Sequence, residues 1–138
     1  MGARRKLLLV DDDEAVIEYL NVKLGGEFEL MATGSPEKVL PLALDGQPDL
    51  VLCDIDLPGM DGGDISAALF ANPETRGIPL LFLTALVTPE DLAAQGNQLA
   101  GRAAISKQSS IEEIAARIRG RSANPCSRSW VGYVREVT

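Results

Sequence analysis

Residues 49–62, DLVLCDIDLPGMDG, contain four consecutive apolar residues that lead directly into an acidic one. The apolar run, residues 50–53, has the length and composition of a strand buried on both faces of a sheet. Packing gives such a strand no reason to end on a carboxylate, yet Asp54 follows it and a second acid and a Pro-Gly turn signal come next. The stretch therefore predicts a buried strand that delivers Asp54 to a loop for a chemical purpose.

Four other short apolar runs are strand candidates of the same kind. Segments with helical signals lie between them, as where Val16, Leu20 and Leu24 recur at helical spacing. Five alternations of strand and helix predict an α/β fold, in which a doubly wound five-stranded parallel sheet is flanked by helices. The four runs are KLLLV at 6–10, FELMA at 28–32, PLLFLT at 79–84 and AAIS, the weakest, at 103–106.

Several residues predict where helices begin, end or weaken. Ser110 is expected to cap the last helix, and Gly120 to end it. Pro41 falls inside the second helical segment, which it should shorten or kink. Gly96 falls inside the fourth, at a cost of about 1 kcal/mol relative to Ala.

Length, charge and composition limit the classes of function. The 138 residues suit one compact domain, expected over residues 1–120, with residues 121–138 as a C-terminal tail or linker. The net charge of −7 argues against direct binding to nucleic acid or to an anionic membrane. The lack of histidine excludes a Ser-His-Asp triad. No stretch is long enough to cross a membrane, and two cysteines far apart suit a reducing compartment, so a cytoplasmic protein is expected.

Chemically active side chains stand where the predicted strands end. The acidic residues 11–13 follow the first strand, Asp54 the third, Thr84 the fourth and Lys107 the fifth. Ligands collect at the carboxyl ends of strands in open α/β sheets, so these side chains should share one edge. Clustered carboxylates repel one another unless a cation neutralises them, and their hard oxygen atoms favour Mg²⁺ or Mn²⁺. A divalent-cation site is the simplest explanation.

The remaining side chains suggest what such a site could do. A carboxylate can attack phosphorus and form an aspartyl phosphate. A metal ion and the ammonium of Lys107 would spread the charge of the phosphoryl oxygens, while the hydroxyl of Thr84 would hold one of them.

Four motifs, in this order and spacing, resemble the receiver domain of bacterial two-component response regulators, including the chemotaxis-type receivers: LLLVDDDEAV (7–16), DLVLCDIDLPGMDG (49–62), LLFLTA (80–85) and AAISK (103–107). The resemblance covers residues 5–120 and implies the flavodoxin-like receiver fold. It implies that Asp54 is the phosphoacceptor and, with Asp11 and Asp12, a ligand of Mg²⁺. It further implies a metal contact from the backbone carbonyl of Asp56.

The resemblance also implies roles and partners. Thr84 and Lys107 would contact the phosphoryl group, and Thr84 would act as the switch hydroxyl. A sensor histidine kinase or a phosphotransfer protein would supply the phosphoryl group, and an unknown downstream protein or fused domain would respond. The domain would be no enzyme, although it would assist its own phosphotransfer and dephosphorylation. Self-association into a homodimer is left open.

The chain departs from the receiver pattern at two positions. Gln108 follows Lys107 where the family usually has proline, so we expect a trans Lys107–Gln108 bond, because a cis bond before Gln costs about 2.5–4 kcal/mol. A trans bond is expected to move the ammonium away from the phosphoryl position and to slow phosphotransfer, which Gln108→Pro would reverse. Ala104 replaces the aromatic switch residue, so the usual aromatic signal to partners should be missing.

Other readings of these residues stay open. Asp12 or Asp13 could cap the first helix, and Asp54 could belong to a turn. The receiver could be degenerate and act as a metal-free binding module. The DIDLPG segment also resembles the nucleophile loop of haloacid-dehalogenase-type phosphatases, in which Asp56 would be the general acid and base.

Overall fold

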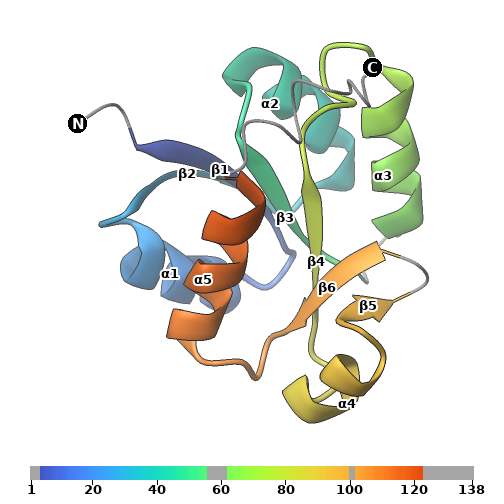
Figure 1. The fold of residues 1–138 in the computed structure, drawn as a ribbon. Coiled ribbons are helices and arrows are strands. Elements are labelled where there is room, and N and C mark those ends of the chain that lie inside the picture. The colour runs from blue at the N-terminus through green and yellow to red at the C-terminus, as the bar shows by residue number, and fades with distance from the viewer. Residues whose placement is uncertain (1–3, 56–61, 100–101, 123–138) are drawn as a thin grey trace.

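The chain forms a mostly parallel sheet with helices on both faces (Figure 1). A computed structural model describes residues 4–55, 62–99 and 102–122. Of the helices in these ranges, none combines the length and the apolar composition that crossing a bilayer would need. The strands are β1 (Arg5–Val10), β2 (Phe28–Thr33), β3 (Leu50–Asp54), β4 (Leu80–Thr84), β5 (Gln98–Leu99) and β6 (Arg102–Ser106). The α-helices are α1 (Glu14–Leu24), α2 (Val39–Gly46), α3 (Gly62–Ala71), α4 (Pro89–Ala94) and α5 (Ile111–Ser122), and a 3₁₀ turn, η1, spans Pro36–Lys38.

The sheet order is β2-β1-β3-β4-β6-β5. β1 pairs in parallel with β2 and β3, and β4 pairs in parallel with β3 and β6. This is the doubly wound order predicted from the alternation of strands and helices. The carboxyl ends of β1 and β3, where the order reverses, therefore lie side by side at one edge, the usual location of a site in such a sheet.

The five predicted parallel strands are present, and a sixth strand that was not predicted adds to them. Gln98–Leu99 pairs antiparallel with the start of β6 at the sheet margin. The prediction that Gly96 lies inside the fourth helix is also wrong, because α4 ends at Ala94. Gly96 and Asn97 have φ angles of +76° and +59°. Consecutive left-handed residues cannot continue a helix, and here they turn the chain back along the sheet.

The sheet separates two layers of core, because alternate side chains of a strand point to opposite faces. Leu7 and Leu9 pack in the cluster that includes residues of α1 and α5, whereas Leu8 and Val10 pack with residues of α2, α3 and α4. Every residue of β3 is buried, as its continuous apolar run predicts. The edge that carries the acidic residues is thus anchored from both sides.

Two helix starts follow the expected capping chemistry. The carboxylate of Asp13 accepts a hydrogen bond from the Ala15 N–H at 3.0 Å and begins α1. The hydroxyl of Ser110 accepts one from the Glu113 N–H at 3.1 Å, and the Glu113 carboxylate accepts one from the Ser110 N–H at 3.1 Å. This reciprocal pair is a capping box, and it confirms Ser110 as the cap of α5.

The second and fifth helices show how local signals compete with packing. Pro41 is the third residue of α2, where its missing N–H costs no helical hydrogen bond. The helix has only eight residues, and it is therefore short, as predicted. Gly120 does not end α5, which continues to Ser122. Arg119 forms a two-oxygen ion pair with Glu27 at 2.9 and 3.0 Å, and this contact helps to hold the last turn.

Ile118→Ala should lower the free energy of unfolding by about 2–5 kcal/mol, because this fully buried side chain fixes α5 to the sheet. Val22→Ala removes a side chain of similar size at a position 73% exposed on α1, and should change that free energy by less than about 0.5 kcal/mol. Urea unfolding followed by circular dichroism measures both. Equal effects would contradict the packing of α5 described above.

Candidate functional site

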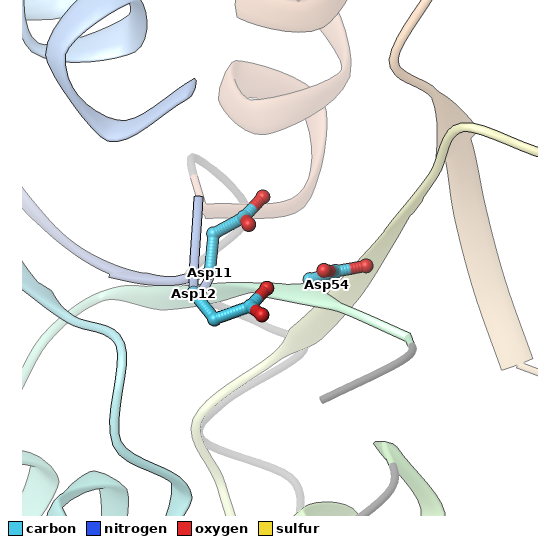
Figure 2. A group of neighbouring side chains, drawn as sticks. All are labelled: Asp11, Asp12 and Asp54. Carbon is cyan, nitrogen blue, oxygen red and sulfur yellow. The ribbon is translucent and has the colours of Figure 1, made fainter. Parts of the chain in front are cut away.

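Three carboxylates meet at the carboxyl edge of the sheet (Figure 2). Asp11 directly follows β1, Asp12 is the next residue, and Asp54 is the last residue of β3. Each offers a carboxylate oxygen, and these oxygens lie within 4.8 Å of one another. Asp11 and Asp54 are 2% and 7% exposed, whereas Asp12 is exposed. The structure thus brings together the predicted acidic cluster and shields two of its members from water.

Three hydrogen bonds hold Asp11 in place. Its N–H donates to the carbonyl oxygen of Thr33, at the end of β2, at 3.1 Å. Its Oδ1 accepts from the Asp13 N–H at 2.9 Å, and its Oδ2 accepts from the Lys107 ammonium at 2.7 Å. The position of this carboxylate is therefore set by residues close to it in the sequence and by Lys107, 96 positions later.

Lys107, just after β6, supplies a positive charge to the carboxylates. Its Nζ lies 2.7 Å from Asp11 Oδ2 and 3.6 Å from Asp54 Oδ2. Burial lowers the pKa of Lys107, but the hydrogen bond and charge of Asp11 and the charge of Asp54 outweigh it and leave the pKa raised. The amine therefore stays protonated at neutral pH and offsets part of the repulsion between the acids.

Thr84 ends β4, the strand beside β3, and is buried. It stands one position beyond Leu83, which pairs with Asp54 in the β3–β4 register. Its hydroxyl oxygen accepts from the Leu86 N–H at 3.1 Å, and its carbonyl oxygen accepts from the Lys107 N–H at 2.7 Å. The end of β4 thus fixes the backbone that carries the lysine.

Cys53 precedes Asp54 and is fully buried. Burial, followed by the charges of Asp54 and Asp11, raises the pKa of its thiol to about 12. The thiol donates to the carbonyl oxygen of Asp54 at 3.2 Å. It is therefore a neutral packing group at neutral pH rather than a nucleophile.

The geometry around Gln108 both supports and corrects the sequence prediction. The described residues contain no cis peptide bond, so the Lys107–Gln108 bond is trans as expected. The expected displacement of the ammonium is wrong, because Nζ reaches both Asp11 and Asp54. The Gln108 N–H also donates to the hydroxyl of Ser106 at 3.0 Å, a bond that proline could not make. The predicted gain from Gln108→Pro therefore loses its physical basis.

The structure describes one of the two remaining predicted positions, Ala104, but not the other, Asp56. Ala104 lies in β6 and is fully buried, so its side chain cannot present a signal at the surface. Asp56, expected to offer its backbone carbonyl to the metal, lies outside the described residues.

One contact at the site was missed by the motifs. Gly34, the residue after β2, lies against the backbone of Asp11 and Asp12. Gly34 follows β2, which pairs in parallel with β1, and the carboxyl ends of parallel strands meet at one edge. This position was the signal that could have placed Gly34 beside the acidic residues. A glycine after a predicted strand is also a common turn residue, so this signal is weak.

Comparison with known proteins gives a consistent result. The family model of the response regulator receiver domain matches residues 7–119. The curated "DNA-binding response regulator MtrA" of Mycolicibacterium paratuberculosis is 35% identical over 119 residues, which are 86% of this chain and 51% of that protein. The chain therefore spans about half the length of this relative.

Solved structures share the fold. A protein of Chloroflexus aurantiacus described as a response regulator is 30% identical, with a TM-score of 0.75 and coverage of 88% of this chain and 100% of that one. The receiver domain of the sensor histidine kinase PA1611 of Pseudomonas aeruginosa PAO1, which holds a magnesium ion in its active site cleft, has a TM-score of 0.73 at 18% identity. The match covers 88% of this chain and 100% of that one, and at this identity it shows a shared fold.

Lys107→Met should lower the free energy of unfolding at neutral pH, without metal, by about 1–3 kcal/mol, because buried Asp11 would lose its cation. Lys38→Met, at an exposed position, should change it by less than about 0.5 kcal/mol. Because the folded pKa of Lys107 lies above its ordinary value of 10.5, the stabilisation is fully present below that pH and is lost as the pH rises through the raised pKa. Chemical unfolding at several pH values tests this, and equal stability of Lys107→Met and wild type at pH 7 would contradict it.

Proposed function

Because the chain belongs to the family of response regulator receiver domains, we propose that Asp54 is the carboxylate that accepts its phosphoryl group. A receiver domain is a signalling domain of a two-component system rather than a classical enzyme. The observation that carries the choice of Asp54 is the convergence of Asp11, Asp12 and Lys107 on this side chain. The phosphatase alternative is set aside, because the family match extends across residues 7–119.

The proposed transfer uses Asp54 as a nucleophile. One of its carboxylate oxygens attacks phosphorus in a phosphohistidine or a small phosphodonor, and an O–P bond forms as the bond to the donor breaks. The leaving group keeps the bonding electrons and takes a proton from solvent. Lys107, already 3.6 Å from Asp54, would stabilise negative charge on the phosphoryl oxygens. This contact would replace part of the attraction that the ammonium now has for the carboxylates.

The hydroxyl of Thr84 is suited to hold one phosphoryl oxygen. Its oxygen atom already accepts the Leu86 N–H, and a hydroxyl can accept and donate at the same time. Its proton can then point toward the phosphoryl group. The same hydrogen bond would carry a movement of Thr84 to the backbone at residue 86, which is the proposed switch.

The carboxylates of Asp11, Asp12 and Asp54 are suited to hold Mg²⁺, or Mn²⁺. They supply hard oxygen ligands within 4.8 Å of one another, and one of them is exposed, so the cation can enter and keep part of its water shell. When bound, the cation would neutralise charge on the transferred group. The backbone carbonyl of Asp56 remains a proposed further ligand.

A sensor histidine kinase or a phosphotransfer protein is the proposed donor of the phosphoryl group. A downstream protein or a fused domain is the proposed recipient of the signal. Ala104 is buried, so that partner would read a change other than the movement of an aromatic side chain at this position. Residues 121–138 were predicted to form a tail or linker; because α5 ends at Ser122, this proposal is kept for the sequence that follows that helix.

Asp54→Ala should abolish phosphorylation, because the attacking oxygen atom is removed. Intact mass after incubation with acetyl phosphate and Mg²⁺ should increase by one phosphoryl group for the wild type and for Asp13→Asn, in which a helix cap is kept. The increase should vanish in excess EDTA. Labelling of Asp54→Ala would place the nucleophile elsewhere, and an unlabelled wild type would favour the degenerate binding module.

Asp12→Asn should weaken Mg²⁺ binding by about tenfold, since it removes one charged ligand at an exposed position while keeping the side-chain shape. Asp13→Asn removes the neighbouring charge outside the cluster and serves as the matched control. Isothermal titration calorimetry gives both affinities. The ligand role of Asp12 is excluded if the two variants lose affinity equally.

A further inference from the structure

Gly34 lies unusually close to the backbone that joins two of the acidic residues. A Cβ atom at this position would lie 3.2 Å from the carbonyl oxygen of Asp11 and 3.4 Å from the Cα of Asp12. Both contacts are with main-chain atoms, which cannot rotate away as the end of a flexible side chain can. Gly34 itself is exposed, so the crowding concerns the acidic loop and not the core.

One hydrogen bond ties the loop that contains Gly34 to the acidic segment, and a second one lies within the loop. The carbonyl oxygen of Thr33, the preceding residue, accepts the Asp11 N–H at 3.1 Å. The hydroxyl oxygen of the same Thr33 accepts the Ser35 N–H at 3.1 Å, across Gly34. An added methyl group would therefore crowd the peptide between Asp11 and Asp12, and relief requires a shift of a few tenths of an ångström. A shift of this peptide moves the backbone that carries both carboxylates.

We propose that Gly34 is a positioning residue for the divalent cation, acting through the backbone of Asp11 and Asp12. The proposal rests on the metal site put forward above. Mg²⁺ requires a nearly ideal octahedron with oxygen ligands at about 2.0–2.1 Å, so a displacement of a few tenths of an ångström matters to it. Ca²⁺ accepts more ligands at longer and more variable distances. The missing side chain at residue 34 therefore supports selectivity for the smaller cation.

Gly34→Ala tests this in the full chain, with two other glycines as controls. Gly26 precedes β2 at its opposite end and has no atom within 4 Å of an added Cβ, so Gly26→Ala reports the general effect of the substitution. A Cβ at Gly46 would lie 2.6 Å from the sulfur of Met31, which is not a member of the acidic cluster, so Gly46→Ala reports the effect of crowding elsewhere. Calorimetric titration with Mg²⁺ and with Ca²⁺ is combined with unfolding in EDTA.

Gly34→Ala should bind Mg²⁺ about tenfold more weakly than wild type, with a smaller loss for Ca²⁺. Both control variants should keep the wild-type affinities, including Gly46→Ala if its stability falls. The inference is overturned if Gly34→Ala binds Mg²⁺ as wild type does, if either control loses as much affinity, or if the loss for Ca²⁺ equals that for Mg²⁺. Absence of Mg²⁺ binding by the wild type would overturn the proposed metal site itself, and this result is separate from the other three.

Discussion

A carboxylate buried at the edge of the sheet needs a positive charge, and the contact between Asp11 and Lys107 meets this need. Asp11 is 2% exposed, and a charge so shielded from water is costly unless it is paired. Its cation comes from 96 positions later in the sequence, so the pair forms only when β1 and β6 belong to the same sheet. The strands between them carry Asp54 and Thr84 at their ends. Folding of the sheet and assembly of the site are thus one event.

The charge balance also explains why the site suits a dication. Three carboxylates and one ammonium leave a formal charge of −3 + 1 = −2 where the cluster forms. Such a surplus destabilises the protein without metal and favours the binding of a divalent cation. A phosphoryl group would add further negative charge beside Asp54, so the cation and Lys107 would stabilise the site more strongly after transfer than before it. In the proposed function, the same residues would therefore connect stability, metal binding and phosphorylation.

The sequence is enough to predict the parallel sheet and the place of its acidic residues. Apolar runs mark the strands, and the ends of parallel strands share an edge, so the sequence alone groups Asp11, Asp54, Thr84 and Lys107. The roles of these residues came from a family resemblance, since carboxylates alone do not distinguish a phosphoacceptor from a metal ligand. The edge strand β5 could not be predicted, because it depends on two left-handed residues after α4. The positions of the Lys107 ammonium and of Gly34 depend on tertiary contacts that no local pattern contains.

A crystal structure with Mg²⁺ and beryllofluoride, which imitates a phosphoryl group on a carboxylate, would test the central assignment most directly. We expect beryllium bonded to a carboxylate oxygen of Asp54, Mg²⁺ held by Asp11 and Asp12, and the Lys107 ammonium in contact with a fluorine atom. A beryllofluoride group on another residue, or a metal ion bound away from Asp11 and Asp12, would contradict the assignment.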